Sequence, residues 1–175
     1  LVKRKGVEQV LRALNTLNDS DIGFMIVGSG PEEENLKKFC KENNLKDVYF
    51  EGFRQQNELS RYYALADVFI LPSSLAGLGI VILEAFGFGL PVIGSNVHGI
   101  RELLAENRGL LFDVNDARGL ATQIETLVTN PQLRIEYGRR GHDYVINNHD
   151  ICVYVRRLHD MYHLALVANG KQILQ

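Results

Sequence analysis

The chain has 175 residues, of which 46% are hydrophobic and 23% charged, as expected for one soluble globular domain with a sizeable core. The formal net charge of −2 argues against a nucleic-acid partner. No apolar run approaches the ~20 residues of a transmembrane helix and no signal peptide is recognisable. Cys40 and Cys152 are far apart and are predicted to be reduced thiols in a cytoplasmic protein.

Apolar and polar segments alternate along the chain in the manner of strands and helices that follow one another. Residues 1–6 read as the end of a strand and a loop, and Pro31 is expected at the first position of a helix. The tail at 169–175 is expected to fray. The predicted strands are 22–27, 48–51, 67–71, 91–94 and 109–112, and the predicted helices are 7–17, 32–43, 57–65, 79–88, 100–105, 117–128, 131–147 and 152–168.

This alternation with short loops predicts an α/β fold, a parallel sheet with helices on both faces. Ligands of such sheets bind at the carboxyl ends of the strands, near the point where the strand order reverses. Glycine loops follow three predicted strands, and we expect them all at this edge. They contain Gly28 and Gly30, then Gly52, and then Gly77 and Gly79.

The third loop is the most informative. The apolar run 68–71 ends at Pro72, a glycine loop follows, and a helix begins near Gly79. Backbone amides at such a helix start suit a diphosphate, and Glu84 lies about one turn further on, within reach of a sugar hydroxyl. The alternative is an ordinary turn of an α/β domain, with Glu84 as a solvated helix residue.

Several segments of the chain match a known family in their order and spacing. They are Lys5-Gly6, Val27-Gly28-Ser29-Gly30-Pro31, Val48 to Phe53, Tyr63 to Val68, Pro72-Ser73-Ser74, Gly79 to Ile93, Gly99 to Leu103 and Gly109 to Phe112. Over about residues 3–163 the chain resembles the C-terminal, nucleotide-sugar-binding domain of the retaining glycosyltransferases of family 4 (glycosyl transferases group 1). The resemblance implies a Rossmann-like sheet as half of a two-domain GT-B architecture.

The resemblance implies two catalytic roles. Lys5 matches the lysine that neutralises the donor diphosphate and stabilises the leaving group. Glu84 matches the second glutamate of the family's Glu-x7-Glu motif, which accepts hydrogen bonds from the ribose. The plainer alternatives are a solvated loop lysine and a surface glutamate.

The other implied roles concern donor binding. Gly52, Phe53 and Arg54 match the loop that contacts the base, largely through backbone groups, although Phe53 could simply pack. Gly28 and Gly30 shape the turn below the donor. The loop around the phosphates and the donor sugar is matched by Ser73, Gly77, Leu78, Gly79, Ile80 and Val81.

The chain departs from the family in two respects. The first motif glutamate would fall at Ala76, so transfer is lost or altered, or the position was mutated, or another group compensates. A Gly-Arg pair, the first strand and the acceptor-binding N-terminal domain have no counterpart in these residues. A sheet without an inner strand would expose unpaired edges, and we predict that these residues alone do not transfer sugar.

The resemblance implies a metal-independent hexosyltransferase without a cofactor, which moves sugar from a nucleotide-diphosphate sugar to a saccharide or lipid acceptor. Polysaccharide, glycolipid and lipopolysaccharide synthesis are the expected settings, with peripheral association at the inner face of the membrane left open. We assign residues 1–150 to the nucleotide-sugar-binding domain and 151–175 to a C-terminal helix and tail. Two alternatives remain: a catalytically silent nucleotide-binding or scaffold protein, which Ala76 favours, and an epimerase of the same fold.

Overall fold

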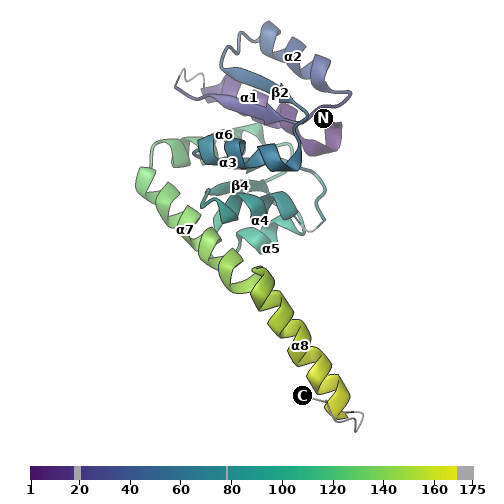
Figure 1. Ribbon diagram of the computed structural model, residues 1–175. Helices are drawn as coiled ribbons and strands as arrows, with labels where there is room; N and C mark the ends of the chain where they lie inside the picture. Colours follow the sequence, from purple (N-terminus) through teal and green to yellow (C-terminus); the bar gives the residue numbers. More distant parts are fainter. Residues whose placement is uncertain (18–20, 78, 169–175) are drawn as a thin grey trace.

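The computed structural model of the chain describes residues 1–17, 21–77 and 79–168. Strands and helices alternate through most of the chain (Figure 1). The strands are β1 (Phe24–Val27), β2 (Val48–Gly52), β3 (Phe69–Leu71), β4 (Val92–Ser95) and β5 (Gly109–Phe112). The α-helices are α1 (Val7–Leu17), α2 (Glu33–Glu42), α3 (Leu59–Leu65), α4 (Ile80–Gly87), α5 (Ile100–Leu104), α6 (Ala117–Val128), α7 (Pro131–Asn148) and α8 (Ile151–Ala168), and two short 3-10 helices are η1 (Lys3–Lys5) and η2 (Gln56–Glu58).

The start of the chain differs from the prediction. Residues 3–5 form η1 rather than the end of a strand. Pro31 lies in a turn before α2 instead of at its first position. The amide of Glu33 donates to the Gly30 carbonyl within this turn at 3.1 Å, and the amide of Glu32 donates to the Leu1 carbonyl at 3.2 Å, which joins the turn to the N-terminal segment.

The strands form parallel sheets, as predicted, but two of them rather than one. β1 pairs with β2, and β4 lies between β3 and β5. A cleft of about 670 Å³ separates β1 from β3 and is lined by residues 21–28 of one sheet and 65–72 of the other. Within the described part of the chain, the facing edges of β1 and β3 have no strand partner, so the expected exposed edges are present.

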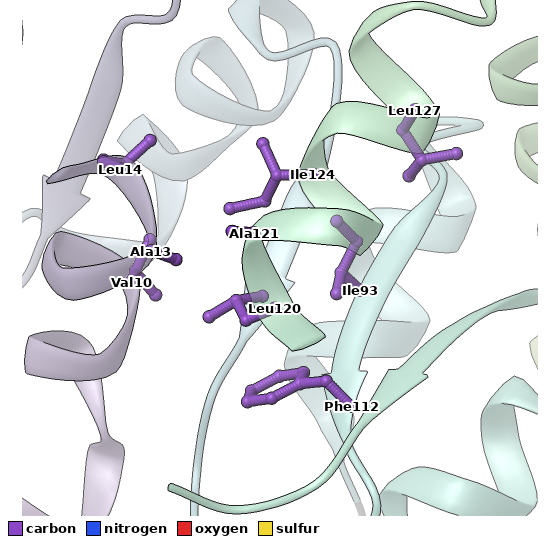
Figure 2. Close-up of a cluster of buried hydrophobic side chains, with 9 residues drawn as sticks. All are labelled: Val10, Ala13, Leu14, Ile93, Phe112, Leu120, Ala121, Ile124 and Leu127. Carbon is purple, nitrogen blue, oxygen red and sulfur yellow. The ribbon is translucent and has the colours of Figure 1, made fainter. Parts of the chain in front are cut away.

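Helices cover both faces of the three-stranded sheet. Ile93 on β4 packs with α1 and α6 in one buried cluster, which Figure 2 shows. Its neighbour Val92 points to the opposite face, where it packs with α4 and α5. Alternation along β4 therefore supplies two separate cores, as a doubly covered parallel sheet requires.

Helix α1 joins the two sheets. Val10, Ala13 and Leu14 belong to the cluster in Figure 2, whereas Leu11 packs with Ile26 of β1 and with α2. The two sheets thus share one helix across the cleft.

Helix α8 extends away from the body of the protein (Figure 1). Exposed apolar side chains along it include Ile151, Val155 and Met161. Within residues 1–17, 21–77 and 79–168, we find no helix with the length and apolar character needed to cross a membrane. The division at residue 150 stays a prediction, and residues 169–175 lie outside the described part.

Candidate functional site

The loops after β1 and β2 meet at the carboxyl ends of these strands. The Gly28 amide donates to the Gly52 carbonyl at 2.7 Å. Both residues have positive φ, 126° and 67°, which favours glycine at these positions. Gly30 lies against Leu1, where a Cβ would overlap the backbone. Gly28 and Gly52 are therefore brought together at this edge, whereas Gly30 packs against the N-terminal residue.

The Lys5 segment is tied to the loop after β3. The amide and hydroxyl of Ser74 donate to the Arg4 carbonyl at 2.9 and 3.2 Å. Gly6 has φ 68°, and a Cβ there would overlap the carbonyl oxygen of Pro72. Lys5 is exposed and lines the cleft between the sheets. No acidic side chain among the described residues forms an ion pair with it, so its ammonium group is available to an anion.

The predicted phosphate loop leads into an uncapped helix start. Gly79, in the left-handed conformation (φ 59°), precedes Ile80, the first residue of α4, and no side chain caps the helix amides. A Cβ at Gly99 would overlap the Gly77 carbonyl, so the two loops are in close contact. Ile80 and Val81 are exposed beside this start. Leu78 lies outside the described residues. The amides of the first turn can meet an anion.

Ser73 lies beneath this loop and is buried. Its carbonyl accepts a hydrogen bond from the Ser95 hydroxyl. Its own hydroxyl has no hydrogen-bond partner among the described residues. Buried hydroxyls are ordinarily paired, so Ser73 keeps an unused polar atom at the predicted donor site.

The Glu84 carboxylate is held by two side chains. Gln56 Nε2 donates to Oε1 at 3.0 Å and Tyr63 Oη donates to Oε2 at 2.7 Å. Burial of Tyr63, together with its bond to Glu84, raises the pKa of the phenol well above its ordinary value. The Tyr63 ring stacks on Phe88 with 5.3 Å between ring centroids. Glu84 is thereby fixed at the carboxyl edge and is not a freely solvated helix residue.

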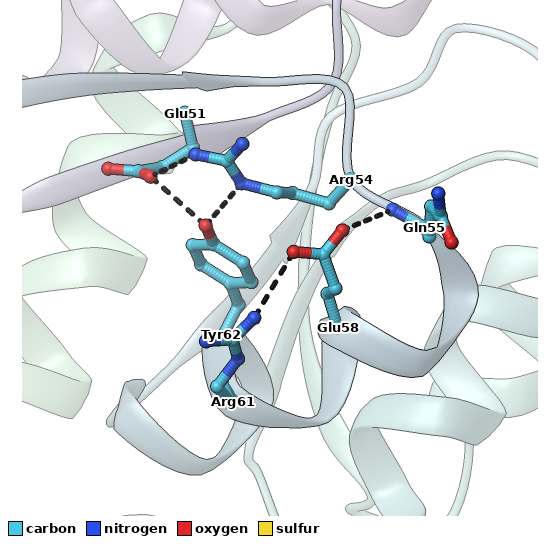
Figure 3. A network of polar contacts seen from close by, with 6 residues as sticks. All are labelled: Glu51, Arg54, Gln55, Glu58, Arg61 and Tyr62. Carbon is cyan, nitrogen blue, oxygen red and sulfur yellow. Dashed lines mark hydrogen bonds and ion pairs between the residues drawn. The ribbon is translucent and has the colours of Figure 1, made fainter.

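The predicted base loop has one open and one occupied side chain. Phe53 is 73% exposed and therefore is not a packing residue. Arg54 donates to Glu51 at 3.0 Å and to the Tyr62 hydroxyl, as Figure 3 shows. The bonds from Arg54 and then Tyr62 lower the pKa of the Glu51 carboxyl. Since the Arg54 guanidinium is bonded to Glu51 and Tyr62, the backbone groups of this loop and the Phe53 side chain remain open to a base.

Sequence reasoning did not find Gln56 or Tyr63 as site residues. Tyr63 stood only within a segment that resembles the family, and its partner Glu84 is 21 residues away. No helical or strand spacing connects positions so far apart. The structure alone reveals these two donors.

A metal cluster is not formed by the described residues. We find no group of three His, Cys, Asp or Glu side chains in residues 1–17, 21–77 and 79–168 that could hold an ion. Lys5 and the start of α4 supply a positive charge and a helix dipole to the site.

An α/β fold whose glycine loops and basic segment lie at the carboxyl ends of parallel strands defines a Rossmann-like domain. The chain belongs to the family of glycosyl transferases group 1, whose model matches residues 1–144.

Relatives in this family are similar over most of the chain. Sulfoquinovosyl transferase SQD2 of Arabidopsis thaliana is 33% identical over 148 residues, which are 81% of this chain and 28% of that protein. Lipopolysaccharide core biosynthesis glycosyltransferase LpsE of Rhizobium meliloti is 32% identical over 147 residues, 83% of this chain and 42% of that protein. The chain thus spans less than half of the length of these relatives.

Solved structures share the fold. Sucrose-phosphate synthase from Thermosynechococcus elongatus has a TM-score of 0.83 and 27% identity, with 95% of this chain and 44% of that chain covered. Anabaena HepE in complex with UDP has a TM-score of 0.85 and 22% identity, with 93% and 46% covered. These neighbours confirm the α/β class and the GT-B relationship.

Proposed function

We propose that this chain is the donor-binding, C-terminal domain of a family 4 retaining glycosyltransferase. The observation that carries the proposal is the meeting of the Lys5 segment, the uncapped start of α4 and the fixed Glu84 carboxylate at one sheet edge. Together they offer a cation, backbone donors and an acceptor, the set that a nucleoside diphosphate requires.

Each part of the donor has a place in this proposal. The diphosphate lies at the amides of residues 79–81 with Lys5 beside it, and the ribose donates to Glu84. The base lies against the loop of Gly52 and Phe53. Lys5 and the dipole of α4 stabilise the negative charge that develops on the leaving diphosphate, so a metal is not required.

The acceptor is held by a domain other than this one. In the proposal it is a saccharide or a lipid, in keeping with the names of relatives such as the GDP-mannose-dependent phosphatidylinositol monomannoside mannosyltransferase of Mycobacterium tuberculosis. A cytoplasmic position at the inner face of a membrane follows from such acceptors. Because transfer needs both domains, the 175 residues alone are expected to be inactive.

A catalytically silent domain is the second candidate, and Ala76 is the observation that favours it. Ala76 is half-buried and packs against the cluster around α4 and α5. A methyl group offers neither charge nor acceptor to a donor sugar. Sugar transfer should be measured in a chain that also carries the acceptor domain, before and after Ala76→Glu. Activity that appears only in the variant supports the silent reading, activity in both supports transfer, and a changed UDP-sugar as product indicates an epimerase.

Calorimetric titration with UDP, GDP and ADP tests donor binding directly. We expect one nucleotide to bind, and Glu84→Ala to weaken it by about 1–3 kcal/mol, the cost of losing a charged hydrogen-bond partner. Glu125→Ala on α6 removes a carboxylate from another part of the protein and should leave the affinity unchanged. Failure of all three nucleotides to bind would refute the donor-site proposal for this chain.

A further inference from the structure

The two donors to Glu84 come from the segment that follows the proposed base loop. Gln56 opens η2 and Tyr63 lies on α3, whereas Glu84 lies on α4. The bonds therefore connect the loop beside the base with the helix whose start faces the phosphates. Such a connection fixes the Glu84 carboxylate, the proposed ribose acceptor, relative to the base loop and to the start of α4.

The two hydrogen bonds occupy only half of the acceptor sites of the Glu84 carboxylate. An ionised carboxylate has about four lone-pair sites, two on each oxygen. Gln56 occupies one on Oε1 and Tyr63 one on Oε2. Each oxygen keeps one acceptor site, and two adjacent acceptor sites match two adjacent hydroxyl donors.

We infer that Tyr63 and Gln56 are positioning residues that hold the Glu84 carboxylate for simultaneous hydrogen bonds from the 2′- and 3′-hydroxyls of a ribonucleoside diphosphate. The inference rests on the proposed function. It adds to that function two residues that act on the ribose only through Glu84 and do not themselves touch the ligand.

The two positioning residues contribute unequally. The Tyr63 ring is stacked on Phe88, and its centroid lies 5.7 Å from that of the Phe69 ring. Packing of the ring therefore fixes the position of the hydroxyl independently of its bond to Glu84. This hydroxyl is protonated at neutral pH, as in any tyrosine, and is therefore a donor to Glu84. Gln56 is exposed, and holding its side chain costs conformational entropy. Tyr63 therefore carries most of the positioning.

The test compares each ribonucleotide with its deoxy forms. For whichever of UDP, GDP and ADP binds, calorimetry gives the dissociation constants of the ribonucleotide and of its 2′-deoxy and 3′-deoxy counterparts. In the unmodified chain we expect each deoxy form to bind about tenfold more weakly, because a charged hydrogen bond is lost. In Tyr63→Phe this ratio should fall to about threefold or less, chiefly through weaker binding of the ribonucleotide. Gln56→Leu should lower it by about twofold.

Tyr137→Phe is the matched control. It removes a hydroxyl from another half-buried tyrosine, on α7 beside the core cluster of Figure 2, and should leave the ratio unchanged. Thermal unfolding of each variant shows that the fold is kept. A Tyr63→Phe protein that retains the full ratio would overturn the positioning role, whatever its stability. If the unmodified chain binds none of the nucleotides, the proposed function itself fails, which is a different outcome.

Discussion

The two sheets differ in how completely they are covered. In the three-stranded sheet, all four residues of β4 are buried and both edges of the strand are paired. In the two-stranded sheet, Tyr49 of β2 is 50% exposed and Val27 of β1 is 36% exposed. One edge of β1 faces the cleft. The three-stranded sheet is a core element, whereas the two-stranded sheet has one well-buried face.

This difference divides the proposed donor site. Glu84 and the start of α4 belong to the well-covered sheet, and Gly28, Gly52 and Phe53 extend from the partly covered one. Phosphate and ribose would therefore meet a rigid surface and the base a more easily deformed one. Regions with fewer buried contacts open at lower free energy, so we expect base recognition to tolerate more movement than ribose recognition.

Truncation of core residues should give the largest contrast between the sheets. Ile93→Ala leaves a cavity in a fully buried cluster and should lower the free energy of unfolding by about 2–5 kcal/mol. Val27→Ala removes a partly exposed side chain from β1 and should lower it by less than about 1 kcal/mol. Urea denaturation measures both values. Equal losses would show that the two sheets are equally packed.

Close helix contact should give the next largest effect. Gly141 of α7 faces the Phe86 ring of α4, and a Cβ there would overlap it. Gly141→Ala is expected to cost about 1–3 kcal/mol through overpacking. Gly87→Ala, on α4 with open space around it, should gain up to about 1 kcal/mol from helix propensity. Urea denaturation distinguishes them, and a neutral Gly141→Ala would mean that α7 moves freely against α4.

Cys40 reports on opening of the partly covered sheet, and Cys152 on α8 is the exposed reference. Cys40 is buried beside Leu11 and Ile26, and burial raises the pKa of its thiol, whereas Cys152 is exposed. We expect a thiol reagent at neutral pH to label Cys40 slower than Cys152 by on the order of a hundredfold. Single variants Cys40→Ser and Cys152→Ser assign each phase.

A variant that weakens the packing of α1 tests where the opening that exposes Cys40 occurs. Leu11→Ala should accelerate the labelling of Cys40, because it removes the contact of α1 with β1 and α2. Ala13→Gly, on the other face of α1, serves as the control for a general loss of helix stability. Equal acceleration in both variants would place the opening in α1 as a whole and not in the two-stranded sheet.

Sequence patterns predicted the elements well where the signal is local. The helices at 7–17 and 117–128 have the predicted bounds, because each combines a strong apolar stripe with a clear start or end. The gap between β1 and β3 was expected only from the family resemblance and not from either strand, since a strand's own residues do not specify its partner. The fold class is confirmed, while the roles of the predicted site residues stay predictions.

The site was predictable only in part, for a similar reason. Glycines after strands indicated the edge, and their contacts agree with it. The engagement of Arg54 by Glu51 and Tyr62, and the burial of Ser73, depend on tertiary contacts. Positions that look alike in a motif therefore differ in whether their side chains are available to a ligand.

A fall in pH should give the smallest effect on stability, and this effect should be confined to the base loop. Because Arg54 and Tyr62 lower the pKa of Glu51 in the folded protein, the charged carboxylate stabilises this loop above the unfolded pKa. That contribution is lost as the pH falls through the lowered folded pKa. An NMR titration of the Glu51 side chain should therefore show a midpoint below the ordinary glutamate value, and Arg54→Ala should raise it. Glu102, whose pKa is lowered by backbone hydrogen bonds at the start of α5, is the control and should keep its midpoint in that variant. A Glu51 midpoint unaffected by Arg54→Ala would mean that the guanidinium is not held as Figure 3 shows and is free to meet a ligand.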